Sequence, residues 1–150
     1  MRFWTTAIII IIADQLSKLW VAGQLALNET RPLIDGILNL VYVRNRGAAF
    51  GILQGKSWLF LIMAAFIVGA LIYYNFRYSP KHWGQYAMGL ITGGTIGNVI
   101  DRLYLGGAVR DFFSAGWFPV FNLADMAITT GGALVVLYIF LYDIGGEQSV

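Results

Sequence analysis

Four long apolar runs constrain this chain more than any other feature of its sequence. They cover residues 4–22, 58–76, 83–100 and 123–142. Each comes close to the roughly 20 mostly apolar residues that a helix needs to cross a bilayer. The chain is 58% hydrophobic and only 12% charged, whereas ordinary soluble domains carry about 25% charged residues. We therefore predict an all-α integral membrane protein with four transmembrane helices, forming a single domain over residues 1–150.

The first apolar run invites a second interpretation, that of a cleaved signal peptide. Arg2 precedes the run, as a basic residue would in a signal peptide. However, Asp14 and Lys18 interrupt the run, and no clean Ala-x-Ala cleavage site follows it. We therefore expect a helix that is retained in the protein.

Composition also excludes several kinds of site. The net charge of +2 and the lack of a basic patch argue against nucleic acid as a partner. The sequence contains no cysteine, which excludes disulfides, cysteine-ligated zinc and a thiol nucleophile. Its single histidine, His82, would have to carry any Ser-His-Asp triad or histidine-rich metal site alone, and no His-Glu-x-x-His motif is present. We therefore expect no cysteine-based or histidine-rich metal site, and no motif in the sequence points to a cofactor.

The two long connections between the runs differ in character. In the first, residues 37–44 are rich in β-branched and aromatic residues with partial alternation, which predicts a strand and a small sheet on the membrane surface. The other, residues 101–122, is rich in aromatic side chains, including Phe112, Phe113 and Trp117. Such rings favour the membrane–water interface, so we interpret them first as interfacial anchors.

Polar residues gather at one set of helix ends. Because helices joined in series alternate in direction, the end of the first, the start of the second, the end of the third and the start of the fourth share one membrane face. The unusual polar residues lie at or near these ends: Asp14, Lys18, Asn45, Asn98, Asp101, Arg102, Asp111, Asn122 and Asp125. Ionisable groups within a span are costly and are usually functional. The pattern predicts one polar site near one membrane surface.

Purely structural interpretations exist for two of these pairs. Asp14 and Lys18 are four residues apart on one helix, the spacing of a neutralising ion pair. Asn122 suits the N-cap position, and Asp125 suits the first turn of a helix, where the dipole favours an acid.

Other elements of the third run also have structural interpretations. Asp101 next to Arg102 could form an ion pair at the helix end. Gly89, Gly93 and Gly97 recur every four residues and predict a small-residue stripe at which another helix packs closely.

Aspartates at one membrane face suggest a hydrolytic chemistry. Two close carboxyl groups cannot both ionise cheaply, so they share one proton, and the pair can then activate a water for attack on a peptide bond. The repeated Asn-x-x-Asp spacing points to Asp101 with Asp125 as that pair. A small aspartate-based, proton-coupled transporter would use the same residue types, and a purely structural membrane protein is a further alternative.

Five strings in the sequence are more specific. They are Ala-Asp-Gln-Leu-Ser-Lys (13–18), Asn-Arg-Gly-Ala-Ala-Phe-Gly (45–51), Gly-Asn-Val-Ile-Asp-Arg (97–102), Gly-Ala-Val-Arg-Asp-Phe (107–112) and Phe-Asn-Leu-Ala-Asp (121–125). In content and in order they resemble the motifs of the lipoprotein signal peptidase (signal peptidase II) family. The resemblance covers nearly the whole chain.

The resemblance implies an aspartic endopeptidase of the bacterial cytoplasmic membrane. Such enzymes remove the signal peptide from prolipoproteins by cutting just before a diacylglyceryl-modified cysteine. The family resemblance implies Asp111 and Asp125 as the catalytic pair, in place of Asp101 with Asp125. The supporting residues that it implies are Asp14, Lys18, Asn45, Asn98, Arg102 and Asn122. It implies no metal, and it suggests a monomer surrounded by membrane lipid.

The resemblance also implies an orientation. The family has four transmembrane helices, a small extracytoplasmic β-element and both termini in the cytoplasm. The distribution of lysine and arginine alone favours the opposite orientation, because more of them lie on the side of the candidate site. We follow the resemblance, since several of these arginines adjoin candidate site residues.

Overall fold

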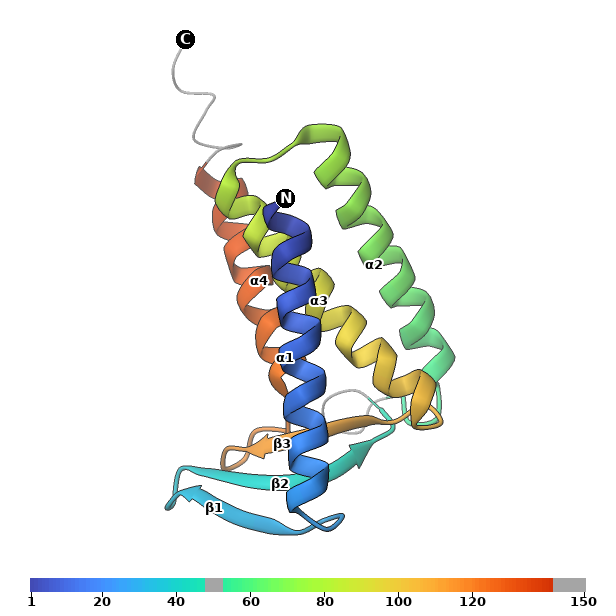
Figure 1. The fold of residues 1–150 in the computed structure, drawn as a ribbon, viewed down its shortest axis with the longest axis vertical. Coiled ribbons are helices and arrows are strands. Elements are labelled where there is room, and N and C mark those ends of the chain that lie inside the picture. Colours follow the sequence, from blue (N-terminus) through green and yellow to red (C-terminus); the bar gives the residue numbers. More distant parts are fainter. Residues whose placement is uncertain (48–52, 142–150) are drawn as a thin grey trace.

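The computed structural model describes residues 1–47 and 53–141, and within these ranges it contains four helices and three strands (Figure 1). In chain order they are α1 (Arg2–Gln24), β1 (Thr30–Ile34), β2 (Leu38–Asn45), α2 (Ser57–Tyr78), α3 (His82–Tyr104), β3 (Val109–Ser114) and α4 (Leu123–Ile139). The helices run along the long axis of the molecule, and the sheet lies across one end (Figure 1). The start of α1 and the last turn of α4 lie at the opposite end (Figure 1).

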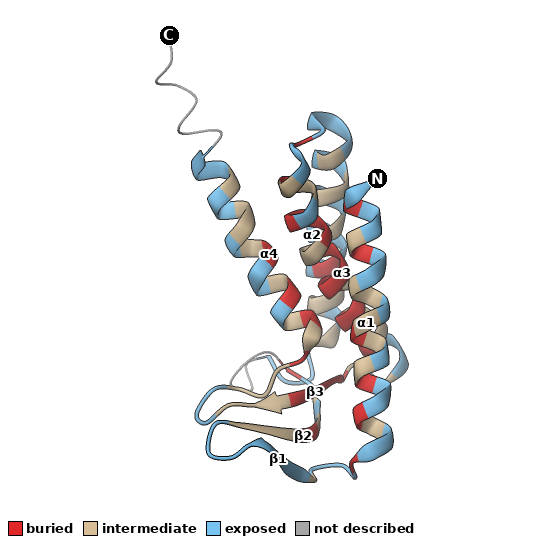
Figure 2. Ribbon diagram, turned by 60° about the vertical axis from the view of Figure 1, so that its left-hand side comes forward, coloured by how far each residue is buried: buried red, intermediate tan, exposed pale blue. Residues whose placement is uncertain are grey.

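The four helices follow the four apolar runs closely. By length and composition, α1 and α2 are long and apolar enough to cross a membrane, whereas α4 is apolar but shorter. The fourth run was expected to reach residue 142, which lies outside the described residues, and α4 ends at Ile139. Helix α3 carries more glycine and polar residues because it packs between α1 and α4 (Figure 2).

The glycine stripe of α3 is the surface on which α1 packs, as the sequence predicts. A Cβ atom added to Gly89 would lie 2.7 Å from the carbonyl oxygen of Phe3, and one added to Gly93 would lie 2.7 Å from that of Ala7. Small residues at such positions let two helix backbones approach each other closely. The buried residues of α1 and α3 accordingly face one another (Figure 2).

Helix α4 packs on a different side of α3 in the same way. A Cβ atom at Gly94 would lie 2.5 Å from the carbonyl oxygen of Ala124, and one at Gly131 would lie 2.7 Å from that of Ala87. Helix α2, in contrast, contacts α3 and has Ala64 as its one buried residue. It stands apart from α4 (Figure 1), and near its C-terminal end the Phe76 ring lies 6.4 Å from the Trp4 ring of α1.

The sheet is antiparallel, with strand order β1-β2-β3. Strand β2 confirms the strand predicted over residues 37–44. Strand β3 was not predicted, because its segment was interpreted as part of a connection. It forms by long-range pairing with β2, with Asp111 opposite Val43 and Phe113 opposite Leu40. Asp111 therefore sits on a strand, which gives its side chain a fixed direction.

A small apolar core joins the sheet to the end of α1. Phe112 is 2% exposed and packs in one cluster with Val21, Leu25 and Tyr42. The interpretation of Phe112 as an interfacial anchor is therefore wrong, because alternation along β3 turns this ring into the core. Trp117 is 86% exposed, so its ring is accessible for contact with lipid.

Two adjacent glycines of α4 provide a matched test of this packing. Gly131→Ala places a methyl group against α3, and we expect a loss of about 1–3 kcal/mol, the usual cost of overpacking. Gly132→Ala meets no atom within 4 Å, so we expect unchanged or slightly raised stability because alanine favours helix. Thermal unfolding of the purified variants in detergent measures both changes in stability. Equal melting temperatures for the two variants would contradict the packing described for α3 and α4.

Candidate active site

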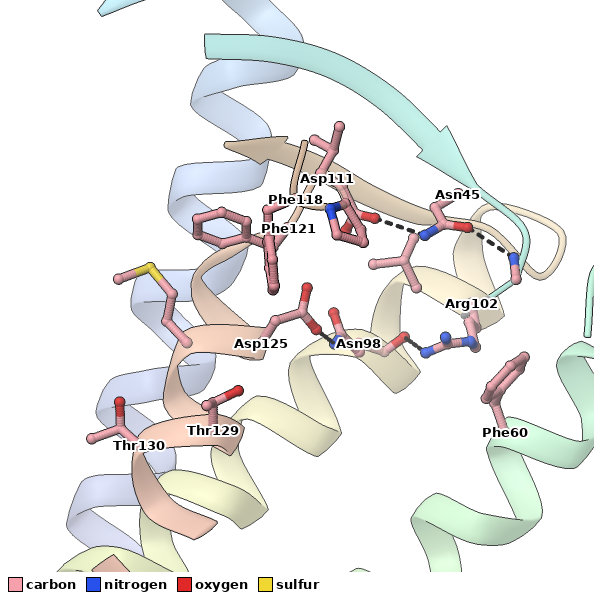
Figure 3. Close-up of a pocket in the computed structure, with 15 residues that line it drawn as sticks. Asn45, Phe60, Asn98, Arg102, Asp111, Phe118, Phe121, Asp125, Thr129 and Thr130 are labelled. Carbon is pink, nitrogen blue, oxygen red and sulfur yellow. Dashed lines mark hydrogen bonds between the residues drawn. The ribbon is translucent and has the colours of Figure 1, made fainter. Parts of the chain in front are cut away.

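A cavity of about 570 Å³ lies where the sheet meets the helices (Figure 3). Its walls come from β2, β3, α2, α3, α4 and the segment between β3 and α4. The lining residues are Asn45, Gly47, Phe60, Asn98, Arg102, Val109, Asp111, Phe118, Pro119, Val120, Phe121, Asp125, Met126, Thr129 and Thr130. Most of the wall is apolar, and two carboxyl groups, Asp111 and Asp125, face the same cavity (Figure 3).

Asp111 enters the cavity from β3 and is 3% exposed. The side-chain amide of Asn122 donates a hydrogen bond of 2.6 Å to its Oδ1. The amide of Asn45, at the end of β2, donates one of 3.0 Å to its Oδ2 (Figure 3). Both oxygens of Asp111 are therefore held by amide donors from different elements.

Asp125 enters from the first turn of α4, where it forms a capping box with Asn122. The Asn122 Oδ1 accepts from the Asp125 backbone N–H at 3.0 Å, and the Asp125 Oδ2 accepts from the Asn122 backbone N–H at 3.1 Å. The predicted capping role of Asn122 is thus confirmed. Because the other oxygen, Oδ1, accepts from Asn98 Nδ2 at 2.8 Å (Figure 3), the cap and the cavity share one carboxyl group.

The electrostatic surroundings of the two carboxyl groups differ. Burial of Asp111, followed by the nearby charge of Asp125, raises the pKa of Asp111 to about 7. The hydrogen bonds from Asn45 and Asn122 oppose this shift, because they favour the ionised form. Asp125 lies at a helix N-terminus, where the dipole stabilises a negative charge. The arrangement favours a proton on Asp111.

Lys18 lies behind this pair and does not line the cavity. Its ammonium group is 2.8 Å from Asp14 Oδ2, 2.9 Å from Asn98 Oδ1 and 3.7 Å from Asp101 Oδ2. The side chains of Lys18, Asp14 and Asp101 are fully buried. The predicted Asp14–Lys18 ion pair is present, and through Asn98 it connects to the cavity.

Asp101 occupies a different environment from Asp111. Arg110 binds it with its backbone N–H at 2.8 Å and with guanidinium donors at 3.1 and 2.6 Å. This pairing takes the place of the expected ion pair with Arg102. Asp101 does not line the cavity, and its carboxylate is ion-paired with Arg110 and Lys18. Its surroundings are those of a structural carboxylate.

Arg102 lines the cavity on the side of α2. Its guanidinium carbon lies 4.6 Å from the centre of the Phe60 ring, and Nη1 donates a 3.4 Å hydrogen bond to the Asn98 carbonyl (Figure 3). The structure therefore brings Asn45, Asn98, Arg102, Asp111 and Asp125 to the cavity wall, with Asn122, Lys18 and Asp14 behind it. Residues 48–51 of the second motif lie outside the described residues.

Arg110 and Gln15 were missed by the sequence analysis. The Gln15 amide donates to the Gly97 carbonyl at 3.0 Å, and its oxygen accepts from Arg110 at 3.3 Å. Gln15 thereby links α1 to α3 and β3. Apart from their places next to Asp14 and Asp111 in the motifs, neither residue carries a local sequence signal. Gln15 binds Gly97 and Arg110, which are more than 80 residues away. Arg110 pairs with Asp101, nine residues before it, because β3 lies beside the end of α3.

Two carboxyl groups that face one cavity can perform general acid–base hydrolysis if they share one proton. The ionised group can accept a proton from a water, and the protonated one can donate to the oxygen of a scissile carbonyl. The apolar wall would exclude other water and strengthen these interactions.

Comparison with known sequences identifies the relatives of the chain. The family described as Signal peptidase (SPase) II matches residues 6–141. A lipoprotein signal peptidase of Syntrophomonas wolfei is 49% identical over 141 residues, which is 94% of either chain. A lipoprotein signal peptidase of Halothermothrix orenii is 37% identical over 144 residues, covering 96% of this chain and 99% of the relative.

Two solved structures of bacterial membrane enzymes have the same fold. One superposes with a TM-score of 0.89 at 33% identity, over 97% of this chain and 91% of the other. The second has a TM-score of 0.83 at 35% identity, over 93% and 92% of the two chains. Together with the match along residues 6–141, these similarities show that the chain belongs to the signal peptidase II family.

Proposed function

We propose that this chain is a membrane aspartic endopeptidase that removes the signal peptide from diacylglyceryl-modified prolipoproteins, cutting just before the lipidated cysteine. Membership of the signal peptidase II family supports signal peptide removal as the reaction. The observation that carries the aspartic mechanism is the pair Asp111 and Asp125, which face one cavity from a strand and a helix (Figure 3).

In the proposed reaction, Asp111 and Asp125 share one proton and have different roles. Ionised Asp125 accepts a proton from a water, whose oxygen attacks the scissile carbonyl carbon. Protonated Asp111 donates to the carbonyl oxygen and stabilises the tetrahedral intermediate. The C–N bond then breaks, the proton held by Asp125 passes to the leaving amine, and one hydroxyl proton of the intermediate returns to Asp111. This is general acid–base catalysis without a covalent intermediate, and no metal or cofactor takes part in it.

The other polar residues support this pair in the proposal. Asn45, Asn98 and Asn122 hold the two carboxyl groups by hydrogen bonds. Arg102 and the cavity asparagines Asn45 and Asn98 orient the substrate backbone. Asp14 and Lys18 support Asn98 from behind.

The substrate reaches the cavity from the bilayer in this proposal. Phe60 of α2 and Met126 of α4 line the wall, and α2 stands apart from α4 (Figure 1). The signal helix of the prolipoprotein would bind along this side while its diacylglyceryl chains stay in lipid. We propose that the chain acts as a monomer and as a single domain over residues 1–150.

We propose that all four helices span the bacterial cytoplasmic membrane. A 23-residue helix such as α1 or α3 is about 34 Å long, and the hydrocarbon core is about 30 Å thick. The sheet, with the cavity beneath it, would lie at the extracytoplasmic surface. Both termini would lie in the cytoplasm.

Single cysteines test this orientation, because the chain has none of its own. Leu33 in β1 and Tyr78 at the end of α2 are similarly exposed, at 57% and 59%, and lie at opposite ends of the molecule (Figure 1). In intact cells, a membrane-impermeant maleimide should label Leu33→Cys, and it should label Tyr78→Cys only after permeabilisation. The reverse pattern would show that the sheet faces the cytoplasm.

Cleavage of a synthetic prolipoprotein tests the function and the pair together. Wild-type protein in detergent should cut the diacylglyceryl-modified form and leave the unlipidated form intact. Asp111→Asn and Asp125→Asn should each lower kcat by about 10²–10⁴-fold or more, since each removes an acid–base group. Their melting temperatures should stay close to wild type, because asparagine keeps the shape of the side chain. A gel-shift assay measures the product.

Asp101→Asn serves as the matched control in the same assay. It weakens the partner of Arg110 and Lys18, so its main effect should be a lower melting temperature, with folded molecules still active. An inactive but stable Asp101→Asn beside an active Asp111→Asn would replace the proposed pair by Asp101 and Asp125. No cleavage by folded wild type would favour the transporter alternative.

The raised pKa of Asp111 gives the reaction a defined pH dependence. Asp111 must carry a proton, and it loses that proton as the pH rises through about 7. We therefore expect kcat/KM to fall above about pH 7. Asn45→Ala removes a donor that favours ionised Asp111, so the alkaline limb should move to higher pH. A limb that stays in place or moves to lower pH in Asn45→Ala would contradict the assignment of the proton to Asp111.

A further inference from the structure

Three asparagine side chains donate to the aspartate pair, and the oxygen of each amide is bound to a donor. Asn45 Oδ1 accepts from the Gly47 backbone N–H at 2.9 Å. Asn122 Oδ1 accepts from the Asp125 backbone N–H at 3.0 Å. Because a backbone N–H can only donate, each of these amides is forced to turn its NH₂ group towards a carboxylate.

Asn98 differs from the other two because side chains, and not a backbone N–H, orient its amide. Its Oδ1 accepts from the Lys18 ammonium at 2.9 Å and from Asn122 Nδ2 at 3.1 Å. An ammonium group has three donors and no acceptor. The Asn98 NH₂ group therefore has to face Asp125, where Nδ2 lies 2.8 Å from Oδ1.

The direction of this amide matters to the chemistry at Asp125. An NH₂ group that faces a carboxyl oxygen stabilises the ionised form. If the Asn98 amide turned over, its oxygen would face Asp125 instead and would favour a protonated carboxyl group. The burial of Lys18, at 0% exposure, makes its charge-assisted hydrogen bond to Asn98 stronger than it would be in water.

We propose that Lys18 is a positioning residue of this enzyme, acting through Asn98 to keep Asp125 as the ionised, water-activating member of the pair. The proposal rests on the function proposed above and assigns Lys18 a specific role in it. Lys18 does not line the cavity. Its effect reaches the reacting atoms through one amide.

A structural alternative has to be separated from this role. Lys18 also neutralises Asp14, at 2.8 Å, and its loss would leave a buried carboxylate without a partner, which destabilises the fold by itself. Asp14→Asn removes that excess charge. We therefore take Asp14→Asn as the reference protein and introduce Lys18→Met into it, with and without Asn98→Ala.

The experiment is a double-mutant cycle on kcat and KM for the lipidated prolipoprotein, with thermal unfolding as the check on folding. With Asn98 present, Lys18→Met should lower kcat by about tenfold or more and change KM by less than about threefold, since the loss affects a catalytic group. With Asn98→Ala present, Lys18→Met should change kcat by less than about twofold, because contacting residues that act in series are not additive.

Two outcomes overturn the proposal while wild-type cleavage stands. The first is an unchanged kcat when Lys18→Met is introduced into the Asp14→Asn reference protein. The second is an effect of equal size with and without Asn98, which would mark Lys18 as structural. If the Lys18→Met proteins fail to fold, Asn98→Ala is measured in the otherwise unchanged chain. The proposal requires that this variant has a lower kcat than wild type. A wild-type kcat would overturn it. Failure of wild type itself to cleave would instead reject the proposed function.

Discussion

A buried network of charges joins the helices to the sheet, and the candidate site depends on it. Lys18 of α1 lies 2.8 Å from Asp14 of the same helix and 3.7 Å from Asp101 of α3. Asp101 in turn lies 2.6 Å from Arg110 of β3. Asp14 also accepts a hydrogen bond from the backbone N–H of Ala124 in the first turn of α4. Removing one partner of a buried ion pair costs about 3–5 kcal/mol, since it leaves an uncompensated charge. The network therefore fixes four elements relative to one another near one end of the molecule.

The placement of the two cavity aspartates follows from this junction. Arg110 holds β3 against α3, and its neighbour Asp111 points to the cavity instead. The contact of Asp14 with α4 holds the turn that carries Asp125. The four oxygens of the pair accept N–H donors, so the carboxyl groups are oriented before any substrate binds. Catalytic sites gain most from such preorganisation, because no reorientation is needed during the reaction. The glycines of α3 contribute by allowing α1 and α4 to come close enough for these contacts.

Local features of the sequence predicted the local parts of this structure. Apolar runs gave the helices, the four-residue glycine spacing gave a packing surface of α3, and Asn122 gave the cap of α4. Sequence spacing could not predict β3, because its pairing with β2 is long-range. Local spacing also misplaced Asp101. The Asn-x-x-Asp spacing suggested that Asp101 faces Asp125, whereas Asp101 is paired with Arg110 behind the cavity. Its partner Arg110 comes from a strand that no local pattern announced, and only the family motifs pointed to Asp111.

In the proposed mechanism, Asp111 carries the proton of the pair. Infrared spectroscopy during a pH titration measures this proton, since a protonated carboxyl group has its own carbonyl band. We expect a band that is present below about pH 7 and disappears above it in wild type and in Asp101→Asn, and that is missing in Asp111→Asn. A band that survives in Asp111→Asn and is lost in Asp101→Asn would show that Asp101 carries the proton instead. The absence of any carboxyl group that titrates near neutral pH would exclude a shared proton on Asp111.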